Sequence, residues 1–434
     1  MAQDASLPLP SPAPDAPNSG QRASTFRAFR NRNYRLYYGG QLISLSGTWM
    51  QTIAQALLVL EITDSKIALG TVVMLQFLPI TIFVLFAGVI ADRVPKREFI
   101  IGTRAIAMVQ AIILTALVWS GAVELWHVYV LALMLGLSNA FEQPARQAFV
   151  MEMVGREDVS NAVALNSGMF NAARLIGPGI GGFVIAAVGV KGAFLINSLT
   201  FIPIMAALLL MDTSKLFTPE RRKNIGNPLT ELRDGLAYVY RTPAAMYIVI
   251  MLVFVGTFGF NFMVMLPLIN RYMLGGGPIE LGFLMGALGL GAVCSALVLA
   301  RQERATQQTL FVGGVCFSAF IGAVALSQWY AVTLIALLLT GFASTAFQAT
   351  ANTSMQLTAP DHLRGRVMAL YMLLFAGSTP IGGFLTGYMA EHLGVPAAVG
   401  ICAALSGFGV LLGFLYYVLH RERIPSIASE PVPA

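Results

Sequence analysis

Twelve apolar segments constrain the fold of this chain more than any other feature of its sequence. Each has the length of about 20 residues that a helix needs to cross the hydrocarbon core of a membrane. Charged residues make up only 11% of the 434 residues and apolar residues 56%, whereas a soluble protein carries about 25% charged residues. We therefore expect an all-α polytopic membrane protein. The twelve segments span residues 36–60, 67–91, 99–121, 126–149, 161–188, 192–211, 244–268, 280–300, 309–328, 331–352, 367–390 and 397–419.

A single long polar interruption, at 212–243, divides the segments into six and six. The first 25 residues contain almost no apolar run, and such a stretch cannot bury enough apolar surface to become ordered. The predicted organisation is a disordered tail, a six-helix bundle, a linker, a second six-helix bundle and a second tail, at residues 1–25, 26–211, 212–243, 244–423 and 424–434.

The distribution of basic residues predicts the orientation of the segments. If the N-terminus is cytoplasmic, most of the 27 Lys and Arg residues fall on the inner side, and the outer loops hold only Lys66, Lys191 and Arg271. Inner loops of membrane proteins carry such an excess of Lys and Arg. We therefore expect a bacterial inner-membrane protein with both termini in the cytoplasm and the basic linker beside acidic lipid headgroups.

Short sequences recur in the two halves at matching positions. The sequence IGGF at 180–183 returns at 381–384, and each copy is followed by an apolar run and then by Gly-Val, at 189–190 and 394–395. The repeat predicts two pseudo-symmetric six-helix bundles. Halves related in this way usually place a substrate site at their interface, near the middle of the bilayer.

The sequence NAARLIGPGIGGF at 171–183 fits two descriptions. Its glycines match G-x-G-x-x-G, the pattern of a dinucleotide-binding turn, but such a turn needs a preceding strand and an acidic residue about 20 positions later. Here the glycines lie within an apolar helical run, and the next acid is Asp212. Small residues also let membrane helices approach closely, so we interpret this stretch as part of a membrane helix.

Two stretches carry a family resemblance. The sequence GVIADRVPKR at 88–97 resembles the loop 2–3 signature of the major facilitator superfamily, with Pro95 in place of the usual glycine. The matching positions are Gly88, Ile90, Ala91, Asp92, Arg93, Lys96 and Arg97. The sequence RLIGPGIGG at 174–182 resembles the helix-five signature of exporters in that superfamily, through Gly177, Pro178, Gly181 and Gly182.

Two further stretches are similar to one branch of the superfamily. SGTWMQTIAQ at 46–55 and ITDSKIALG at 62–70 resemble the enterobactin-exporter-like, or transmembrane secretion effector, branch. Thr48 stands where some members of that branch have Asp. The resemblance implies the major facilitator fold with 12 transmembrane helices, alternating access and proton antiport. It also implies that helices one, four, seven and ten line a central cavity and that loop 2–3 latches the halves together.

Polar residues form stripes on several segments. In the first segment they are spaced three and four apart, which places them on one helical face. Polar side chains on a lipid-facing stripe would lose water without compensation. We therefore expect the stripes to line a cavity, the alternative being contacts between helices without a substrate. The candidate cavity residues are Gln41, Ser44, Thr48, Gln51, Gln55, Asn139, Ser167, Asn171, Arg174, Thr257, Asn261, Thr340, Ser344, Gln348 and Asn352.

Ionisable residues inside the segments are few. Arg174 shares a helical face with Ser167 and Asn171, and it should point towards a partner, water or an anionic substrate; bonding to helix-end carbonyls beside the Gly-Pro break is the structural alternative. Glu142 and Arg146 could pair with each other or join a network at the inner side. The resemblance favours that network, built from Gly88, Asp92, Arg93, Lys96, Arg97, Glu142 and Arg146. Glu142 and Asp92 are the candidates for carrying the proton.

Enzyme motifs are missing from the sequence. No G-x-x-x-x-G-K-[ST] loop or metal-ligand spacing occurs, so we expect no cofactor, no metal and no nucleic-acid partner. The apolar segments and polar stripes predict a transporter, and the resemblance implies a secondary active, proton-coupled exporter of a small amphipathic molecule, such as a siderophore or drug-like compound, working as a monomer. An importer or facilitator with the same fold, and a non-transporting membrane scaffold or receptor, are the alternatives.

Overall fold

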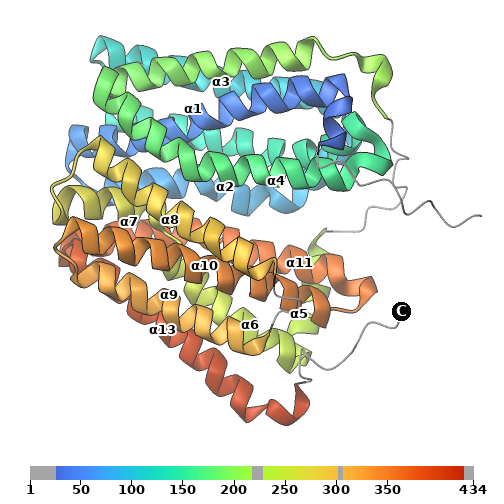
Figure 1. The fold of residues 1–434 in the computed structure, drawn as a ribbon, viewed down its shortest axis with the longest axis vertical. Coiled ribbons are helices and arrows are strands. Elements are labelled where there is room, and N and C mark those ends of the chain that lie inside the picture. The colour runs from blue at the N-terminus through green and yellow to red at the C-terminus, as the bar shows by residue number, and fades with distance from the viewer. Residues whose placement is uncertain (1–25, 218–227, 302–305, 425–434) are drawn as a thin grey trace, which may run out of the picture.

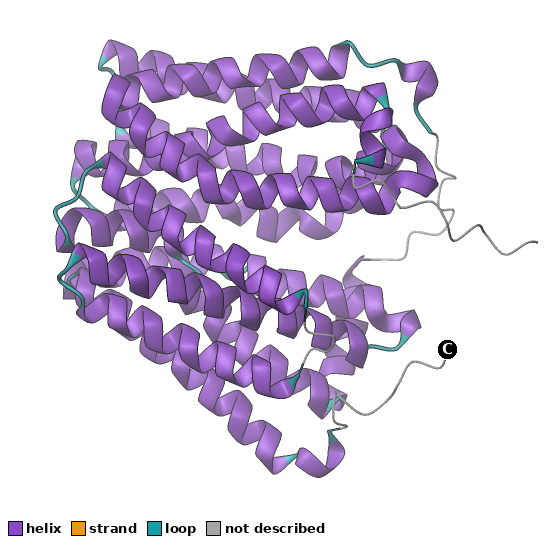
Figure 2. Cartoon of the chain, viewed as in Figure 1, coloured by secondary structure: helices purple, strands orange, loops and turns teal. Residues whose placement is uncertain are grey.

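A computed structural model describes residues 26–217, 228–301 and 306–424. The side chain of Asp92 lies outside this description, as do the predicted tail at 1–25 and residues 425–434 of the second tail. Within these three ranges the regular structure is helical throughout, without a strand (Figure 2). The fold is therefore all-α, as predicted.

The N-terminal half contains one helical element that is much longer than a membrane is thick. Its elements are η1 (Arg27–Arg30), α1 (Arg32–Thr63), α2 (Lys66–Arg93), α3 (Lys96–Ser120) and α4 (Leu125–Leu209). The 85 residues of α4 are broken at Gly155 and Gly189, where φ is 76° and 75°. Positive φ favours glycine because it has no Cβ. The two breaks divide α4 into a first pass at 125–154, a second pass at 156–188 and a third pass at 190–209.

The C-terminal half contains two interrupted passes. The segment from Pro243 to Met273 includes two π-helical turns, and the segment from Asp361 to Leu393 is interrupted at 377–378. The elements that follow α4 are η2 (Thr213–Lys215), α5 (Pro228–Arg241), α6 (Pro243–Phe254), η3 (Val255–Gly259), α7 (Phe262–Leu268), η4 (Ile269–Met273), α8 (Pro278–Leu299), α9 (Gln307–Leu326), α10 (Tyr330–Thr358), α11 (Asp361–Ala376), α12 (Thr379–Leu393), α13 (Val395–Leu419) and η5 (Arg421–Arg423).

Ten helical segments of the described chain are long and apolar enough to cross a membrane. With α4 counted as three passes, they are consistent with the twelve predicted from the sequence. The duplicated IGGF sequences lie at corresponding places, in the second pass of α4 and in α12. The glycine that follows each copy, Gly189 or Gly394, has a positive φ and ends its pass.

The linker at 212–243 is partly folded against each half. The backbone NH of Phe217 donates to the carbonyl of Glu152 over 2.8 Å, which ties the start of the linker to α4. The helix α5 lies on the C-terminal half instead. There Asp234 pairs with Arg366 at 2.8 Å and the Tyr238 hydroxyl donates to the carbonyl of Thr358 over 2.6 Å.

The two halves lie side by side and diverge towards one end (Figure 1). We call this end, which carries η2, α5 and the breaks between helices near residues 94, 155 and 359, the linker end. The opposite end, with the loops near residues 64, 121, 189, 275 and 394, is the far end. The halves meet along two seams, which run between the second pass of α4 and α8, and between α2 and α12.

Glycines make the close approach at both seams possible. A Cβ at Gly182 would lie 2.5 Å from the carbonyl oxygen of Pro278 in α8, and one at Gly70 would lie 2.7 Å from the carbonyl oxygen of Gly383 in α12. Both positions are in the far-end half of their helices. Side chains would force the halves apart there, which explains small residues at the contact.

Polar contacts add to the seams at the far end. The carboxylate of Asp64 accepts from the Tyr272 hydroxyl over 2.6 Å and pairs with Arg271 at 3.1 Å. The Glu391 carboxylate accepts from the backbone NH of Lys66 over 2.6 Å. At the linker end, no ion pair or hydrogen bond joins the two halves among the described residues. The two halves are therefore in contact at the far end and in the middle of the spans, where the Thr81 hydroxyl donates to the carbonyl of Gly377 over 3.4 Å, and they diverge towards the linker end (Figure 1).

Candidate functional site

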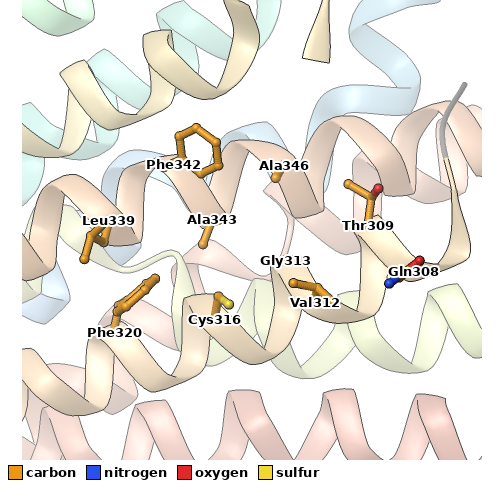
Figure 3. Close-up of a pocket in the computed structure, with 10 residues that line it drawn as sticks. All are labelled: Gln308, Thr309, Val312, Gly313, Cys316, Phe320, Leu339, Phe342, Ala343 and Ala346. Atoms are coloured by element: carbon orange, nitrogen blue, oxygen red, sulfur yellow. The ribbon is translucent and has the colours of Figure 1, made fainter. Parts of the chain in front are cut away.

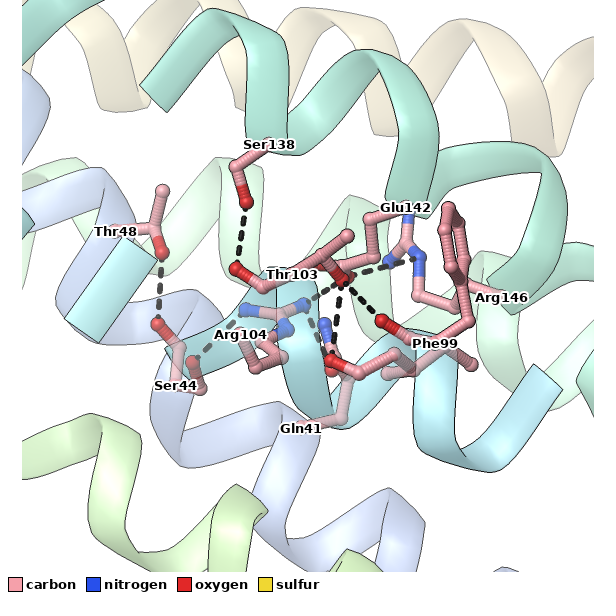
Figure 4. Close-up of polar contacts among 10 residues, drawn as sticks. Gln41, Ser44, Thr48, Phe99, Thr103, Arg104, Ser138, Glu142 and Arg146 are labelled. Atoms are coloured by element: carbon pink, nitrogen blue, oxygen red, sulfur yellow. Dashed lines mark hydrogen bonds and ion pairs between the residues drawn. The ribbon is translucent and has the colours of Figure 1, made fainter. Parts of the chain in front are cut away.

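Glu142 lies at the centre of a buried polar cluster in the N-terminal half (Figure 4). It is only 4% exposed, and its carboxylate is 2.6 Å from the Arg104 guanidinium of α3. Arg104 also donates to Gln41 over 3.2 Å and to Ser44 over 3.3 Å, both in α1. The cluster therefore connects three membrane passes through one carboxylate and one guanidinium.

Arg104 was not among the sequence-predicted site residues. The sequence could have indicated Arg104, because Arg104, Arg146 and Arg174 are the three arginines inside apolar segments. The predicted partner of Glu142, Arg146, lies farther away, with its Nε 3.9 Å from the carboxylate. The Arg146 guanidinium instead stacks over the ring of Phe170, 4.4 Å from its centre. A spacing of four residues identified a neighbour of Glu142, but the stronger partner comes from another helix.

The loop 2–3 residues make their contacts within the N-terminal half. Lys96 pairs with Glu152 at 2.7 Å. Arg97 donates to the carbonyls of Leu208 and Leu209 over 2.8 and 3.2 Å. Arg93 also makes an interaction and is not free. At Gly88 there is open space, because nothing lies within 4 Å of a Cβ placed there. The structure does not bring these described side chains into contact with Glu142, and their role as a latch stays a prediction.

The polar stripe of α1 faces the interior of the N-terminal half. Thr48 donates to the carbonyl of Ser44 over 2.9 Å, and Gln51 accepts from the side chain of Asn197 in the third pass of α4. Gln41, Ser44, Gln51 and Gln55 are buried. A hollow of about 10 Å³ beside Thr48, Gln51 and Gln55 is large enough for about one water molecule. In this conformation the stripe serves contacts between helices, and its contact with a substrate stays a prediction.

The other predicted cavity residues are spread over the two halves. In α10, Thr340 and Ser344 are buried and donate to carbonyls of their own helix, over 2.7 and 2.8 Å. Gln348 and Asn352 of α10, Asn139 of α4 and Thr257 of η3 are half-buried. Asn261, just after η3, donates to the carbonyl of Thr257 over 2.7 Å, while its buried Oδ1 has no partner among the described residues.

Arg174 and its two predicted neighbours lie on the second pass of α4. Ser167, Asn171 and Arg174 are all exposed, and Asn171 donates to the carbonyl of Ser167 over 2.9 Å. Within the described ranges Arg174 has neither an ion pair nor a side-chain hydrogen bond. The four residues of the helix-five signature follow directly and are buried: Gly177, Pro178, Gly181 and Gly182.

A pocket lies elsewhere, between α9 and α10 (Figure 3). Its volume is about 470 Å³, and Val312, Cys316, Phe320 and Phe342 give it an apolar wall. Gln308 and Thr309 supply polar atoms at one end. Val312 and Phe342 are 53% and 36% exposed, so the pocket opens on the surface of the C-terminal half. No residue of the predicted cavity lines it.

A family model described as "Transmembrane secretion effector" matches residues 23–434. The chain belongs to the transmembrane secretion effector family. Solved structures agree with the fold of this transmembrane secretion effector. The nucleoside transporter NupG aligns with a TM-score of 0.71 at 10% identity, over 90% of this chain and 99% of NupG. A bacterial homologue of the human lysosomal transporter Spinster, in an inward-facing and occupied conformation, aligns with a TM-score of 0.68 at 13% identity, over 95% and 100%.

Curated relatives align with most of this chain. The multidrug efflux pump Tap of Mycolicibacterium fortuitum is 27% identical over 394 residues, which is 89% of this chain and 95% of Tap. The staphyloferrin A transporter of Staphylococcus aureus is 22% identical over 89% and 96%. The enterobactin exporter EntS of Shigella flexneri is 24% identical over 87% and 89%. The chain is thus a multi-pass membrane transporter of the major facilitator type and not an enzyme.

Proposed function

We propose that this transporter is a proton-coupled exporter of a small amphipathic molecule, such as a siderophore or drug-like compound. It works as a monomer in the bacterial inner membrane, with both termini and the linker end in the cytoplasm. The excess of Lys and Arg at the linker end supports this orientation. The curated relatives include a multidrug efflux pump and an enterobactin exporter, which supports export.

The observation that carries the proposal is that the described contacts between the two halves lie at the far end and in the middle of the spans. The seams of Gly182 with α8 and of Gly70 with α12 close that end. In the proposed orientation the structure is the inward-open form, ready to take a substrate from the cytoplasm. Export follows when the halves rock about the central site, close the linker end and open the far end.

Loop 2–3 has a place in this cycle. Lys96 and Arg97 hold the start of α3 against other passes of the N-terminal half, which makes the loop rigid with that half. In the outward-open form this loop would brace the closed linker end. The open space around Gly88 is where an element of the C-terminal half would then approach.

Proton coupling is assigned to Glu142, with Asp92 as the second candidate. A proton on Glu142 would remove the charge that holds Arg104. The guanidinium would still have hydrogen-bond acceptors, because Gln41 and Ser44 already accept hydrogen bonds from it. Protonation would therefore loosen the link between α3 and α4 while Arg104 stays attached to α1. This change of partners is how a proton could alter the packing of the N-terminal half.

Everted membrane vesicles carrying the protein test the proposal. A pH gradient is imposed, and siderophores and macrolides are added in turn while the gradient is followed with a pH-sensitive dye. We expect a compound-dependent collapse of the gradient that is lost in Glu142→Gln. The control is Glu157→Gln, which removes the same charge at a side chain that is 87% exposed.

The outcomes separate the parts of the proposal. A collapse that survives in Glu142→Gln keeps export but removes Glu142 as the proton carrier. If the folded wild-type protein responds to none of the compounds, the importer and scaffold alternatives replace the exporter.

A further inference from the structure

One face of the second pass of α4 changes from exposed to buried halfway across the membrane. On this face Val163 is 51% exposed, and Ser167, Asn171 and Arg174 are also exposed. Beginning three residues later, Gly177, Pro178, Gly181 and Gly182 are buried. Three residues correspond to about 4.5 Å along a helix. Arg174 therefore lies at the linker-end edge of the region where the halves touch, and its carbonyl oxygen is 3.5 Å from a Cβ placed at Gly289 of α8.

The same face points between the halves and away from lipid. Ile176, Ile180 and Phe183 are 54%, 51% and 52% exposed, as expected of lipid-facing residues. At about 100° per residue they lie on the opposite side of the helix from Arg174. The exposure of Arg174 is therefore to the space that opens towards the linker end.

The neighbours of this helix come from both halves. A Cβ at Gly177 would lie 2.8 Å from Cβ of Trp49 in α1, and one at Gly289 of α8 would lie 3.0 Å from Cα of Leu175. Arg174 thus lies on the face between the contacts with α1 and α8. A molecule that enters the open space from the linker end and reaches its closed end would meet this guanidinium.

Among the described residues, the charge of Arg174 has no counter-charge at this depth. The other ionised side chains described in the middle of the spans are Arg104, Arg146 and Glu142, and that single carboxylate already binds Arg104. In the C-terminal half, described Asp, Glu, Lys, Arg and His residues occur only near the ends of the spans. A cation at this depth is costly unless water, a partner or a ligand satisfies it. The excess charge is positive, so it favours an anion and repels a cation.

We propose that Arg174, with Ser167 and Asn171, binds the anionic group of the substrate, which makes the substrate an amphipathic anion. This inference rests on the proposed export function and names its substrate class. A guanidinium presents five N–H donors and can bind a carboxylate or a phosphate with two parallel hydrogen bonds. Ser167 and Asn171 add a hydroxyl and an amide on the same face. The apolar part of the substrate would lie against the neighbouring helices.

Two dyes with a common aromatic body and opposite charge test the inference. Fluorescein is a dianion at neutral pH, and rhodamine 123 is a cation built on the same xanthene ring. Their binding is measured by fluorescence anisotropy with the full-length protein in nanodiscs of zwitterionic lipid. We expect wild-type protein to prefer fluorescein and Arg174→Gln to bind it about 10- to 100-fold more weakly, because hydrogen bonds to a charged group are lost. Rhodamine 123 should bind no more weakly to Arg174→Gln than to wild type.

Two variants serve as controls. Arg156→Gln removes the same charge from the start of the same helical pass, about 27 Å away, and should leave fluorescein binding unchanged. Arg174→Lys keeps the charge without the two parallel donors and should retain part of the affinity. It also shows whether a loss in Arg174→Gln reflects charge rather than misfolding.

Lipid headgroups are a second possible source of the anion. Repeating the titration in nanodiscs with an anionic lipid distinguishes them, since a headgroup on Arg174 would compete with fluorescein in wild type. A soluble substrate site predicts the same affinity in both kinds of nanodisc.

The inference is overturned if Arg174→Gln binds fluorescein as well as wild type does, or if Arg156→Gln weakens binding equally. Binding of neither dye by wild type also counts against it, because an unpaired cation in an open space should attract an aromatic anion. Failure of the export proposal looks different. In that case fluorescein binds through Arg174, but energised everted vesicles accumulate neither dye.

Discussion

The seam between the second pass of α4 and α8 allows a sharp test of alternating access. A Cβ at Gly182 would lie 2.5 Å from the carbonyl oxygen of Pro278, whereas ordinary van der Waals contacts of a Cβ begin at 3.4 Å. In Gly182→Ala the two helices must therefore separate by roughly 1 Å, and overpacking of this kind costs about 1 to 3 kcal/mol. The same cost does not arise where the far end is open.

That cost sets the expected shift in the equilibrium between the forms with the far end closed and with the far end open. A difference of about 1 to 3 kcal/mol changes an equilibrium by about 5- to 150-fold. Gly182→Ala should therefore move the population towards the form with the far end open by this factor. Gly179→Ala is the matched control, because it makes the same change three residues away on the same helix, where nothing lies within 4 Å.

Spin labels across the far end measure the shift. Ser120 at the end of α3 and Gln328 between α9 and α10 are exposed and lie in different halves. They can be replaced by cysteine after Cys294, Cys316 and Cys402 are removed. Pulsed electron paramagnetic resonance should show a longer distance gaining weight in Gly182→Ala but not in Gly179→Ala. Identical distance distributions in the two variants would refute the reasoning from the seam.

Two further predictions concern charged contacts. Arg104→Met should lower the free energy of unfolding by up to about 3 to 5 kcal/mol, because it leaves the buried Glu142 carboxylate with only the more distant Arg146. Glu142→Gln should cost less, about 1.5 to 3 kcal/mol, because Gln41 and Ser44 still accept hydrogen bonds from Arg104. Thermal unfolding in detergent, followed by tryptophan fluorescence, compares the stability of the two variants. A loss of stability in Arg104→Met that is equal to or smaller than the loss in Glu142→Gln would contradict the prediction. At the far end, the hydrogen bond from Tyr272 and the charges of Arg271 and Lys66 hold the pKa of Asp64 below its ordinary value of 3.8. The contact is therefore stabilising at and above about pH 4 and is lost as the pH falls through the lowered pKa, so the same spin-label pair should report a loosening in acid that is absent in Asp64→Asn.

The membrane passes could be predicted from the sequence because their cause is local. A run of apolar residues long enough to span the bilayer must form a helix there, whatever its neighbours are. The predicted segment 36–60 lies within α1 at 32–63, and the predicted 161–188 lies within the second pass of α4. The duplicated IGGF sequences likewise lie at equivalent places in the two halves.

The partners of the polar side chains depend on packing, and the sequence could not supply them. A polar face on α1 excludes lipid, but a water-filled space and a neighbouring helix satisfy that requirement equally. The structure turns Gln41 and Ser44 towards Arg104, a residue 60 or more positions away. For Arg174 the sequence left a protein partner, water, an anionic substrate and helix-end carbonyls open, and the described structure shows no ion pair or side-chain hydrogen bond of Arg174 with the protein. Its exposure depends on the conformation, which a sequence pattern does not encode.

The anchoring of the linker on both halves sets a limit on how far they can swing. Phe217 is held by α4, and α5 is held by α11 through Asp234 and Arg366. Only residues 218–227 join these anchored parts. Even fully extended, the eleven steps from 217 to 228 reach about 36 to 40 Å. This reach is an upper limit on the separation of residues 217 and 228, so covalent geometry bounds the width to which this transporter can open at the linker end.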